Sequence, residues 1–242
     1  MLDLHCHILP ELDDGASSLE EALAMARFCV RDGITHIAAT PHCNRSIRLL
    51  RPDILPEVAQ FNRELAQAGV PLTVLPGSEI QITDSASYRS DCEAGVFCHL
   101  GDGREFTLLE FSWHAANYPA DAPALITWLH SRGMTPIVAH PERHSFFQND
   151  PPRLRALVDA GAWLQVTVDS LLGNHGPAPQ SFGEELAGVY PEALLATDAH
   201  NLGRCSGLSV GYAWVRECFG GQRGDQMRAR ADQVLAALLS NQ

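Results

Sequence analysis

Six apolar runs rich in β-branched residues each end in a side chain that can bind a metal ion. The runs occupy residues 2–7, 37–42, 72–79, 106–110, 137–140 and 194–200. In a barrel of parallel strands, all strand ends of one polarity meet at one mouth. The pattern therefore predicts that the terminal His and carboxylate groups converge on a multinuclear metal site, although they are far apart in the sequence.

Segments with helical periodicity separate these runs. Ser17-Ser18-Leu19-Glu20 is a capping-box pattern, and the helix that it begins is expected to end at Gly33. Further helices are predicted at residues 54–68, 124–132 and 152–160, each followed by a glycine. A last helix is predicted at residues 223–240, where we expect it to pack on the outside of the fold.

Residues 163–168 form a seventh predicted strand. The alternation of strand and helix along the chain favours parallel strands with helical crossovers. We therefore predict an α/β fold, a distorted seven-stranded (β/α) barrel that resembles a TIM barrel. A doubly wound sheet is the alternative.

The 242 residues are expected to form one domain, 1–242, because no Pro-, Gly- or Ser-rich linker divides them. No apolar run reaches the roughly 18–20 residues that span a bilayer, so membrane insertion is not expected. A first strand that begins almost at Met1, without an export signal, predicts a cytoplasmic protein. The seven irregularly spaced cysteines indicate reduced thiols rather than disulfides.

The net charge of −12 and the absence of an arginine stripe argue against a nucleic-acid partner, because a phosphate backbone would be repelled. Divalent ions clustered at one mouth would still create a local positive site. We expect an anionic substrate to bind there.

Two pairs of candidate ligands share a spacing of two residues. His5 and His7 on a strand point to the same side of the sheet, and Asp198-Ala199-His200 repeats this spacing in the last run. Glu79 and Glu110 end apolar runs, where burying an unpaired carboxylate is costly. A helix cap or an arginine partner is the alternative for each carboxylate alone. The similar placement of two further histidines, His42 and His140, favours a metal site.

Asp13-Asp14-Gly15 precedes a helix that already has Ser17 and Ser18 as caps. One of the two aspartates is therefore free to reach the mouth, but spacing does not separate Asp13 from Asp14. Of the remaining histidines, His144 is expected near the mouth because it directly follows His140-Pro141-Glu142-Arg143.

Cys98 and Arg104 have the C-x5-R spacing of phosphatases that use a thiolate nucleophile. In those enzymes the loop opens a helix, whereas here the next segment is a predicted strand. Asp102 and Glu105 would also oppose formation of a thiolate and binding of a phosphate. We predict that Cys98 is not a nucleophile.

Several motifs occur together in a recognisable order. They are His5-Cys6-His7-Ile8-Leu9-Pro10, Asp13-Asp14-Gly15-Ala16, Ala39-Thr40-Pro41-His42, Pro76-Gly77-Ser78-Glu79-Ile80, Ala139-His140-Pro141-Glu142-Arg143 and Thr197-Asp198-Ala199-His200-Asn201. In this order they resemble the polymerase and histidinol phosphatase (PHP) superfamily. More narrowly, they resemble its bacterial capsular-type protein tyrosine phosphatases, from about Leu2 to Arg204.

The resemblance implies a site for two to three divalent ions, usually described with Mn²⁺, with Zn²⁺, Fe²⁺ and Mg²⁺ as alternatives. Residue by residue, it implies one ion at His5, His7, Glu79 and Asp198, a second at Glu79, Glu110 and His140, and a third at Asp14, His42 and His200. Arg143 and Arg204 match arginines that approach the phosphate in this family.

The implied activity is hydrolysis of phosphotyrosine on the tail of a bacterial tyrosine kinase that controls capsule or exopolysaccharide synthesis. Two alternatives are a small-molecule phosphatase of the same superfamily, such as a histidinol-phosphate phosphatase, and a non-catalytic metal-dependent module that binds a kinase tail. The chain departs from the family at Val168-Asp169-Ser170 and in the short loop before Arg204, so these departures bear on substrate preference.

Overall fold

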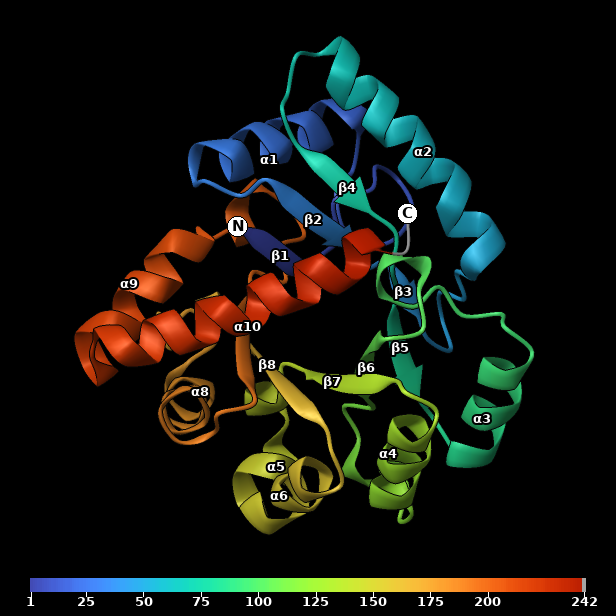
Figure 1. Ribbon diagram of the computed structural model, residues 1–242, viewed down its shortest axis with the longest axis vertical. Helices are drawn as coiled ribbons and strands as arrows, with labels where there is room; N and C mark the ends of the chain where they lie inside the picture. The colour runs from blue at the N-terminus through green and yellow to red at the C-terminus, as the bar shows by residue number, and fades with distance from the viewer. Residues whose placement is uncertain (241–242) are drawn as a thin grey trace.

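The computed structural model describes residues 1–240, and within them the strands form two parallel sheets (Figure 1). The first sheet has the order β1-β2-β4 and contains β1 (Leu2–Cys6), β2 (His36–Ala39) and β4 (Thr73–Leu75). The second sheet has the order β3-β5-β6-β7-β8-β9 and contains β3 (His42–Cys43), β5 (Glu79–Ile82), β6 (Phe106–Phe111), β7 (Thr135–Ala139), β8 (Trp163–Thr167) and β9 (Ala193–Ala196).

Two predicted strands are interrupted. Thr40 and Pro41 separate β2 from β3, and Pro76-Gly77-Ser78 separates β4 from β5. Proline lacks the N–H that a ladder needs, so the chain leaves one sheet at each break and joins the other. An isolated parallel bridge, Cys6 to Ala199, links the end of β1 to the segment after β9. The predicted α/β class with parallel strands is confirmed, whereas closure of seven strands into one barrel stays a prediction.

Helices surround the strands in Figure 1. They are α1 (Leu19–Arg31), α2 (Arg51–Gln67), α3 (Ser85–Glu93), α4 (Ala122–Ser131), α5 (Ser145–Asn149), α6 (Pro151–Asp159), α7 (Val168–Leu171), α8 (Pro177–Val189), α9 (Leu208–Phe219) and α10 (Gly221–Ser240). Four short 3₁₀ helices are η1 (Leu100–Asp102), η2 (Ala115–Asn117), η3 (Pro141–Arg143) and η4 (Leu202–Arg204).

The helices predicted from capping and periodicity are present. Ser18 caps α1 by accepting a hydrogen bond from the backbone N–H of Glu21. The helices α3, α5, α7, α8 and α9 were not predicted. The sequence of α3 is largely polar, and α8 carries two prolines in its first turn and a glycine at position 183, so neither has a clear apolar period.

The predicted last helix is α10, which buries one apolar face, including Met227, and leaves its other face exposed, as expected for a helix on the outside of the fold. Its place over the sheets was not predicted: α10 crosses the strands in Figure 1 and contacts β1 and β9. Its buried Ala231, Val234 and Leu238 belong to the same apolar cluster as Leu2 and Phe106, which lie at the starts of β1 and β6. The helix therefore covers the amino ends of the strands and leaves their carboxyl ends open.

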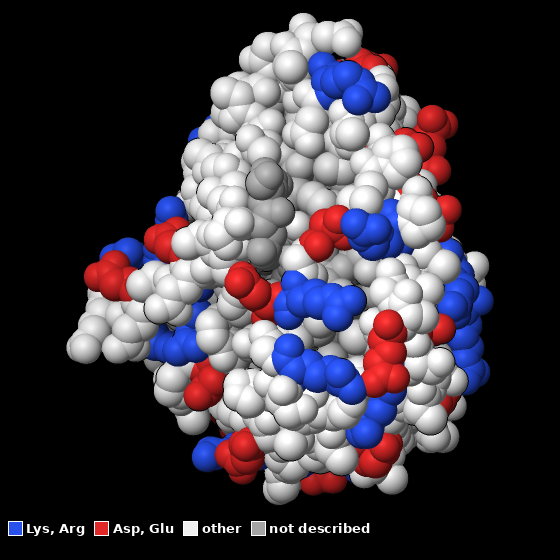
Figure 2. Space-filling view, turned by 45° about the vertical axis from the view of Figure 1, so that its right-hand side comes forward, with Lys and Arg blue, Asp and Glu red and all other residues white. Residues whose placement is uncertain are grey.

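Figure 2 shows arginine and acidic side chains interspersed on one face of the molecule, without an unbroken basic tract on that face. The chain contains no lysine, so all the basic groups in this view are arginines. Several arginines of the chain are paired with a carboxylate, for example Arg51 with Asp102 at 2.6 Å. Among residues 1–240, no helix combines the length and the apolar character needed to cross a bilayer.

Candidate metal centre

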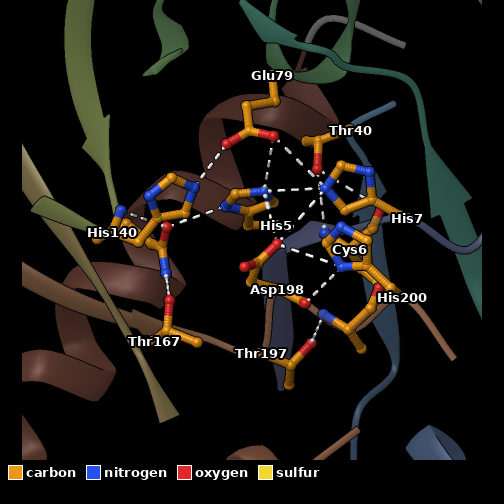
Figure 3. A network of polar contacts seen from close by, with 12 residues as sticks. His5, Cys6, His7, Thr40, Glu79, His140, Thr167, Thr197, Asp198 and His200 are labelled. Carbon is orange, nitrogen blue, oxygen red and sulfur yellow. Dashed lines mark hydrogen bonds and ion pairs between the residues drawn. The ribbon is translucent and has the colours of Figure 1, made fainter. Parts of the chain in front are cut away.

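All nine predicted metal ligands lie close together. They are His5, His7, Asp14, His42, Glu79, Glu110, His140, Asp198 and His200. Within the described residues they form four overlapping groups, and in each group the candidate ligand atoms lie within 4.8 Å of one another. Figure 3 shows imidazoles from different strands pointing toward Glu79 and Asp198.

The convergence follows from parallel strand topology. His5 lies near the end of β1, Glu110 lies near the end of β6, and His140 directly follows β7. Asp198 comes just after β9. Since these strands run in parallel, their carboxyl ends bring together residues that are distant in sequence.

Two of the candidate ligands adopt backbone conformations that are unusual for residues other than glycine. His140 has φ of 31° and Asp198 has φ of 51°, both in the left-handed region. Such conformations cost free energy and are found mainly where function requires a side chain in one place. Here they turn the chain at the ends of β7 and β9, next to the centre.

Glu79 lies in the middle of the cluster. Its Oε1 is 2.8 Å from His140 Nε2, and its Oε2 is 2.9 Å from His42 Nδ1. Although Glu79 Oε2 and His42 Nδ1 are close and buried, neither atom has a hydrogen-bond partner of acceptable geometry within residues 1–240. Unpaired buried polar atoms are costly, and a cation between them would satisfy both. The donor set therefore fits a metal ion.

Asp198 connects the histidines to the two predicted phosphate-binding arginines. Its Oδ1 lies 3.3 Å from His5 Nε2 and 3.5 Å from His7 Nε2. Its Oδ2 accepts a hydrogen bond from Arg143 at 2.6 Å and lies 3.4 Å from a terminal nitrogen of Arg204. Both guanidinium groups are thus placed beside the centre.

The structure separates the two neighbouring aspartates. Asp14 Oδ1 is 3.2 Å from His42 Nε2 and 3.5 Å from His200 Nε2, so Asp14 is the one that joins the cluster. Asp13 instead accepts a hydrogen bond from His7 Nδ1 at 2.7 Å and another from the backbone N–H of His42. It thereby directs His7 Nε2 toward the centre, as is usual for carboxylates behind metal-binding histidines.

Sequence reasoning missed a second group that orients the ligands. Gln165 lies in the buried strand β8, and its Oε1 accepts from His5 Nδ1 at 2.9 Å and from the backbone N–H of His140 at 3.1 Å. A glutamine in the middle of a largely apolar, buried strand was the available signal. By holding Nδ1 of His5, it leaves Nε2 to face the centre.

The electrostatics of the cluster favour a cation. Burial alone would raise the pKa of Glu79, but His5, His140 and His42 lower this pKa well below its usual value. For His7, burial would lower the pKa, whereas hydrogen bonds to Asp13, Asp198 and Glu79 raise it well above the usual value. Binding of a metal ion would displace such protons from the imidazoles.

The pKa of Glu110 is shifted in the opposite direction from the pKa of Glu79. Burial and the nearby charge of Glu79 raise the pKa of Glu110 to about 8. Two carboxylates placed side by side in a buried site repel each other, and a divalent cation between them removes this repulsion.

An open pocket of about 210 Å³ lies over the centre. Its lining contains Trp113 and nine of the charged or imidazole groups described above, from Asp14, His42, Glu79, Glu110, His140, Arg143, Asp198, His200 and Arg204. Trp113 was not predicted as a site residue. His144, which we expected near the mouth, is buried against Trp113, with ring centroids 4.5 Å apart.

Residues 168–170, where the sequence departs from the resembled family, form part of α7. Asp169 in this helix is buried and accepts hydrogen bonds from Ser206 and Asn174. Ser206 lies two residues after Arg204, so this contact ties α7 to the loop that carries the arginine.

The cysteine at position 98 lies outside the centre. Its side chain is fully buried, and burial raises the pKa of the thiol to about 12. The following loop cannot cradle a phosphate with its backbone, because Gly101 N–H donates to Pro76 and Asp102 N–H donates to His99. As predicted, a strand, β6, follows this loop.

We therefore expect Cys98→Ser to keep phosphatase turnover within about twofold of the unchanged protein. The thiol is neither a candidate ligand nor part of the pocket lining, and a thiol-to-hydroxyl change in an apolar site alters stability rather than chemistry. The measurement is kcat with saturating Mn²⁺, with Cys98→Ala as a second variant if the serine protein folds poorly. A loss of several orders of magnitude in a folded variant would instead identify a thiolate mechanism.

Comparisons with known proteins identify the family of this chain. A family model described as "Capsular polysaccharide synthesis, CpsB/CapC" matches residues 1–235. Among curated proteins, the chain is 37% identical over 203 residues to the tyrosine-protein phosphatase YwqE of Bacillus subtilis, covering 84% of this chain and 78% of the relative. It is 28% identical over 239 residues to the tyrosine-protein phosphatase CpsB of Streptococcus pneumoniae, covering 94% of both chains.

A solved structure shows the same fold. It comes from a study of YwqE from Bacillus subtilis and CpsB from Streptococcus pneumoniae, described as "unique metal-dependent tyrosine phosphatases". The TM-score is 0.89 at 33% sequence identity, and the match covers 98% of this chain and 94% of the other. The α/β arrangement is thus shared along almost the whole chain.

Proposed function

Because this chain belongs to the capsular polysaccharide synthesis CpsB/CapC family, we propose that it acts as a metal-dependent protein-tyrosine phosphatase. The observation that carries the proposal is the cluster of nine ligand side chains around Glu79 and Asp198, with two arginines at its edge. An acidic protein needs such a concentration of cations to bind a phosphate dianion.

We assign the nine side chains to two or three Mn²⁺ ions. The first site consists of His5, His7, Glu79 and Asp198, the second of Glu79, Glu110 and His140, and the third of Asp14, His42 and His200. Two of the overlapping groups support this division, since His5 and His7 are grouped with Asp198, and Asp14 is grouped with His42 and His200. Glu79 is grouped with His140 and, separately, with Glu110 and His42, so the second ion is assigned from the resemblance to the family. Nitrogen and oxygen donors suit Mn²⁺, and they also accept Zn²⁺, Fe²⁺ or Mg²⁺.

Divalent ions at this centre would activate water for attack on phosphorus and neutralise charge on the phosphate. Arg143 and Arg204 would hold the non-bridging oxygens of the phosphate, because both guanidinium groups line the pocket beside Asp198. Asp13 and Gln165 keep the imidazoles of His7 and His5 oriented. We assign no general acid, because a phenolate leaves with little help.

The proposed substrate is a phosphotyrosine on the flexible tail of a bacterial tyrosine kinase that acts in capsule or exopolysaccharide synthesis. The family description names capsular polysaccharide synthesis, and the open pocket can admit an extended segment. We place the enzyme in the cytoplasm with this kinase tail, without a nucleic-acid partner.

Phosphotyrosine peptides should be hydrolysed at least about tenfold faster, in kcat/KM, than phosphoserine peptides of matched sequence. A serine alkoxide is a much poorer leaving group than a phenolate, and tenfold corresponds to about 1.4 kcal/mol in the barrier. The assay compares both peptides, with histidinol phosphate as a third substrate. Equal rates on the two peptides, or a preference for histidinol phosphate, would refute the tyrosine phosphatase assignment.

We also propose that residues 1–242 act as one domain in which the two sheets form a single distorted seven-stranded barrel. Two observations support this. The chain passes between the sheets at Thr40-Pro41 and again at Pro76-Gly77-Ser78, so β2 with β3 and β4 with β5 each continue one strand. The Cys6–Ala199 bridge connects β1 with the segment after β9.

A further inference from the structure

We propose that the indole ring of Trp113 is a platform that binds the phenyl ring of phosphotyrosine while the phosphate occupies the metal centre. This inference rests on the proposed function and deepens it. It assigns to one side chain a preference for aryl phosphates over alkyl phosphates.

Trp113 lies at the mouth of the centre. It follows β6, three residues after Glu110, and it lines the same pocket as Glu110 and Arg143. Within residues 1–240, it is the only Trp, Tyr or Phe among the lining residues of this pocket. The opening therefore has one flat apolar surface beside many charged groups.

Two histidine rings support the indole. His144 stacks on Trp113 with ring centroids 4.5 Å apart and an angle of 29° between the planes. His140 is also stacked, with centroids 5.4 Å apart and an angle of 12°. His144 is buried, and in the described part of the chain neither of its ring nitrogens has a hydrogen-bond partner, so it serves the indole as an aromatic packing surface.

In spite of this support, Trp113 remains 46% exposed. An exposed large aromatic side chain that neighbouring rings hold in place loses little conformational entropy on binding. Such rigid, exposed aromatic groups are enriched in binding sites. The exposed part of the indole can therefore accept a second aromatic ring.

Arg143 contacts both the Trp113 ring and Asp198 of the metal centre. Its guanidinium carbon lies 5.1 Å from the centroid of the Trp113 ring, and its Nη1 donates to Asp198 at 2.6 Å. The phenyl ring of phosphotyrosine begins one oxygen atom away from phosphorus. A phosphate held beside Arg143 thus brings the phenyl ring next to the indole, whereas phosphoserine has no ring to place there.

The test compares kcat/KM for a phosphotyrosine peptide and a phosphoserine peptide of matched sequence, using the full chain loaded with Mn²⁺. The variants are Trp113→Leu, Trp113→Phe and Phe219→Leu. Phe219 is the matched control, because it is an aromatic side chain 40% exposed at the end of α9 and does not line the pocket. Metal content is measured in each protein.

Offset stacking of two aromatic rings favours association by a factor of about 2 to 12. We expect Trp113→Leu to lower the ratio of phosphotyrosine to phosphoserine hydrolysis about tenfold, mainly through a higher KM for the phosphotyrosine peptide. Trp113→Phe should keep the ratio within about threefold of the unchanged protein, because a phenyl ring also stacks. Phe219→Leu should keep the ratio unchanged.

An unchanged ratio in Trp113→Leu, with normal hydrolysis by the parent protein, would overturn this inference and leave the proposed function intact. A lower ratio that accompanies a lower metal content would also overturn it, because the indole would then support His140 rather than the substrate. Failure of the parent protein to hydrolyse either peptide with any divalent ion would overturn the proposed function itself.

Discussion

Exhaustive removal of divalent ions should lower phosphotyrosine hydrolysis by at least about 10³-fold, and Mn²⁺ should restore it best. Uncatalysed phosphate-ester hydrolysis is extremely slow, and metal ions contribute several kcal/mol by activating water and neutralising charge. Buried Glu79 and Asp198 would otherwise repel the phosphate.

The measurement is hydrolysis after dialysis against a chelator, followed by addition of single metals at equal free concentrations. Elemental analysis of the protein before chelation should give two to three divalent ions per chain. Full activity in a protein shown to be free of metal would contradict the assigned centre. Restoration by Zn²⁺ or Mg²⁺ rather than Mn²⁺ would change only the identity of the ion.

His140→Ala should lower the metal content, whereas Arg143→Ala and Arg204→Ala should keep it and lower kcat about 10²-fold each. His140 Nε2 lies 2.8 Å from Glu79 at the centre, so its loss removes a proposed ligand. The arginines contact Asp198 and present N–H groups to the pocket. Removing one donor to a developing anionic charge typically costs about 10²- to 10³-fold in turnover.

There is an electrostatic reason why the arginine variants should keep their metal ions. Arg143 neutralises one oxygen of Asp198, so its removal leaves more negative charge for the ions. Matched controls are His36→Ala, at the amino end of β2, and Arg155→Ala, an exposed residue of α6 that pairs with Asp159. Equal loss of metal from all three site variants would refute this division between ligands and phosphate-binding groups.

Much of the centre could be predicted because parallel strands obey a simple rule. The sequence shows where each apolar run ends, and His5, Glu110, His140 and Asp198 stand at such ends. Once the strands are parallel, their carboxyl ends must lie on one side of the fold. The clustering of the candidate ligands other than Asp14 therefore needed no knowledge of side-chain packing, although the assignment of ligands to individual ions stays a proposal.

Other features depend on contacts between segments whose proximity cannot be predicted from the sequence. Spacing left Asp13 and Asp14 equivalent, and only the hydrogen bond from His7 to Asp13 separates their roles. In the same way, Gln165 is recognisable as an orienting residue only when His5, which is 160 positions away in sequence, lies beside it.

The sequence by itself determined the α/β class, the parallel strands and the chemical nature of the centre, because these follow from local periodicity and from which side chains end each strand. Only the tertiary structure decided that the strands divide into two sheets, that α10 covers their amino ends and that Trp113 lies at the mouth. The physical reason is that apolar periodicity tells which face of a helix or strand is buried, but not which other element buries it. That choice is made by packing between elements that are distant in the chain.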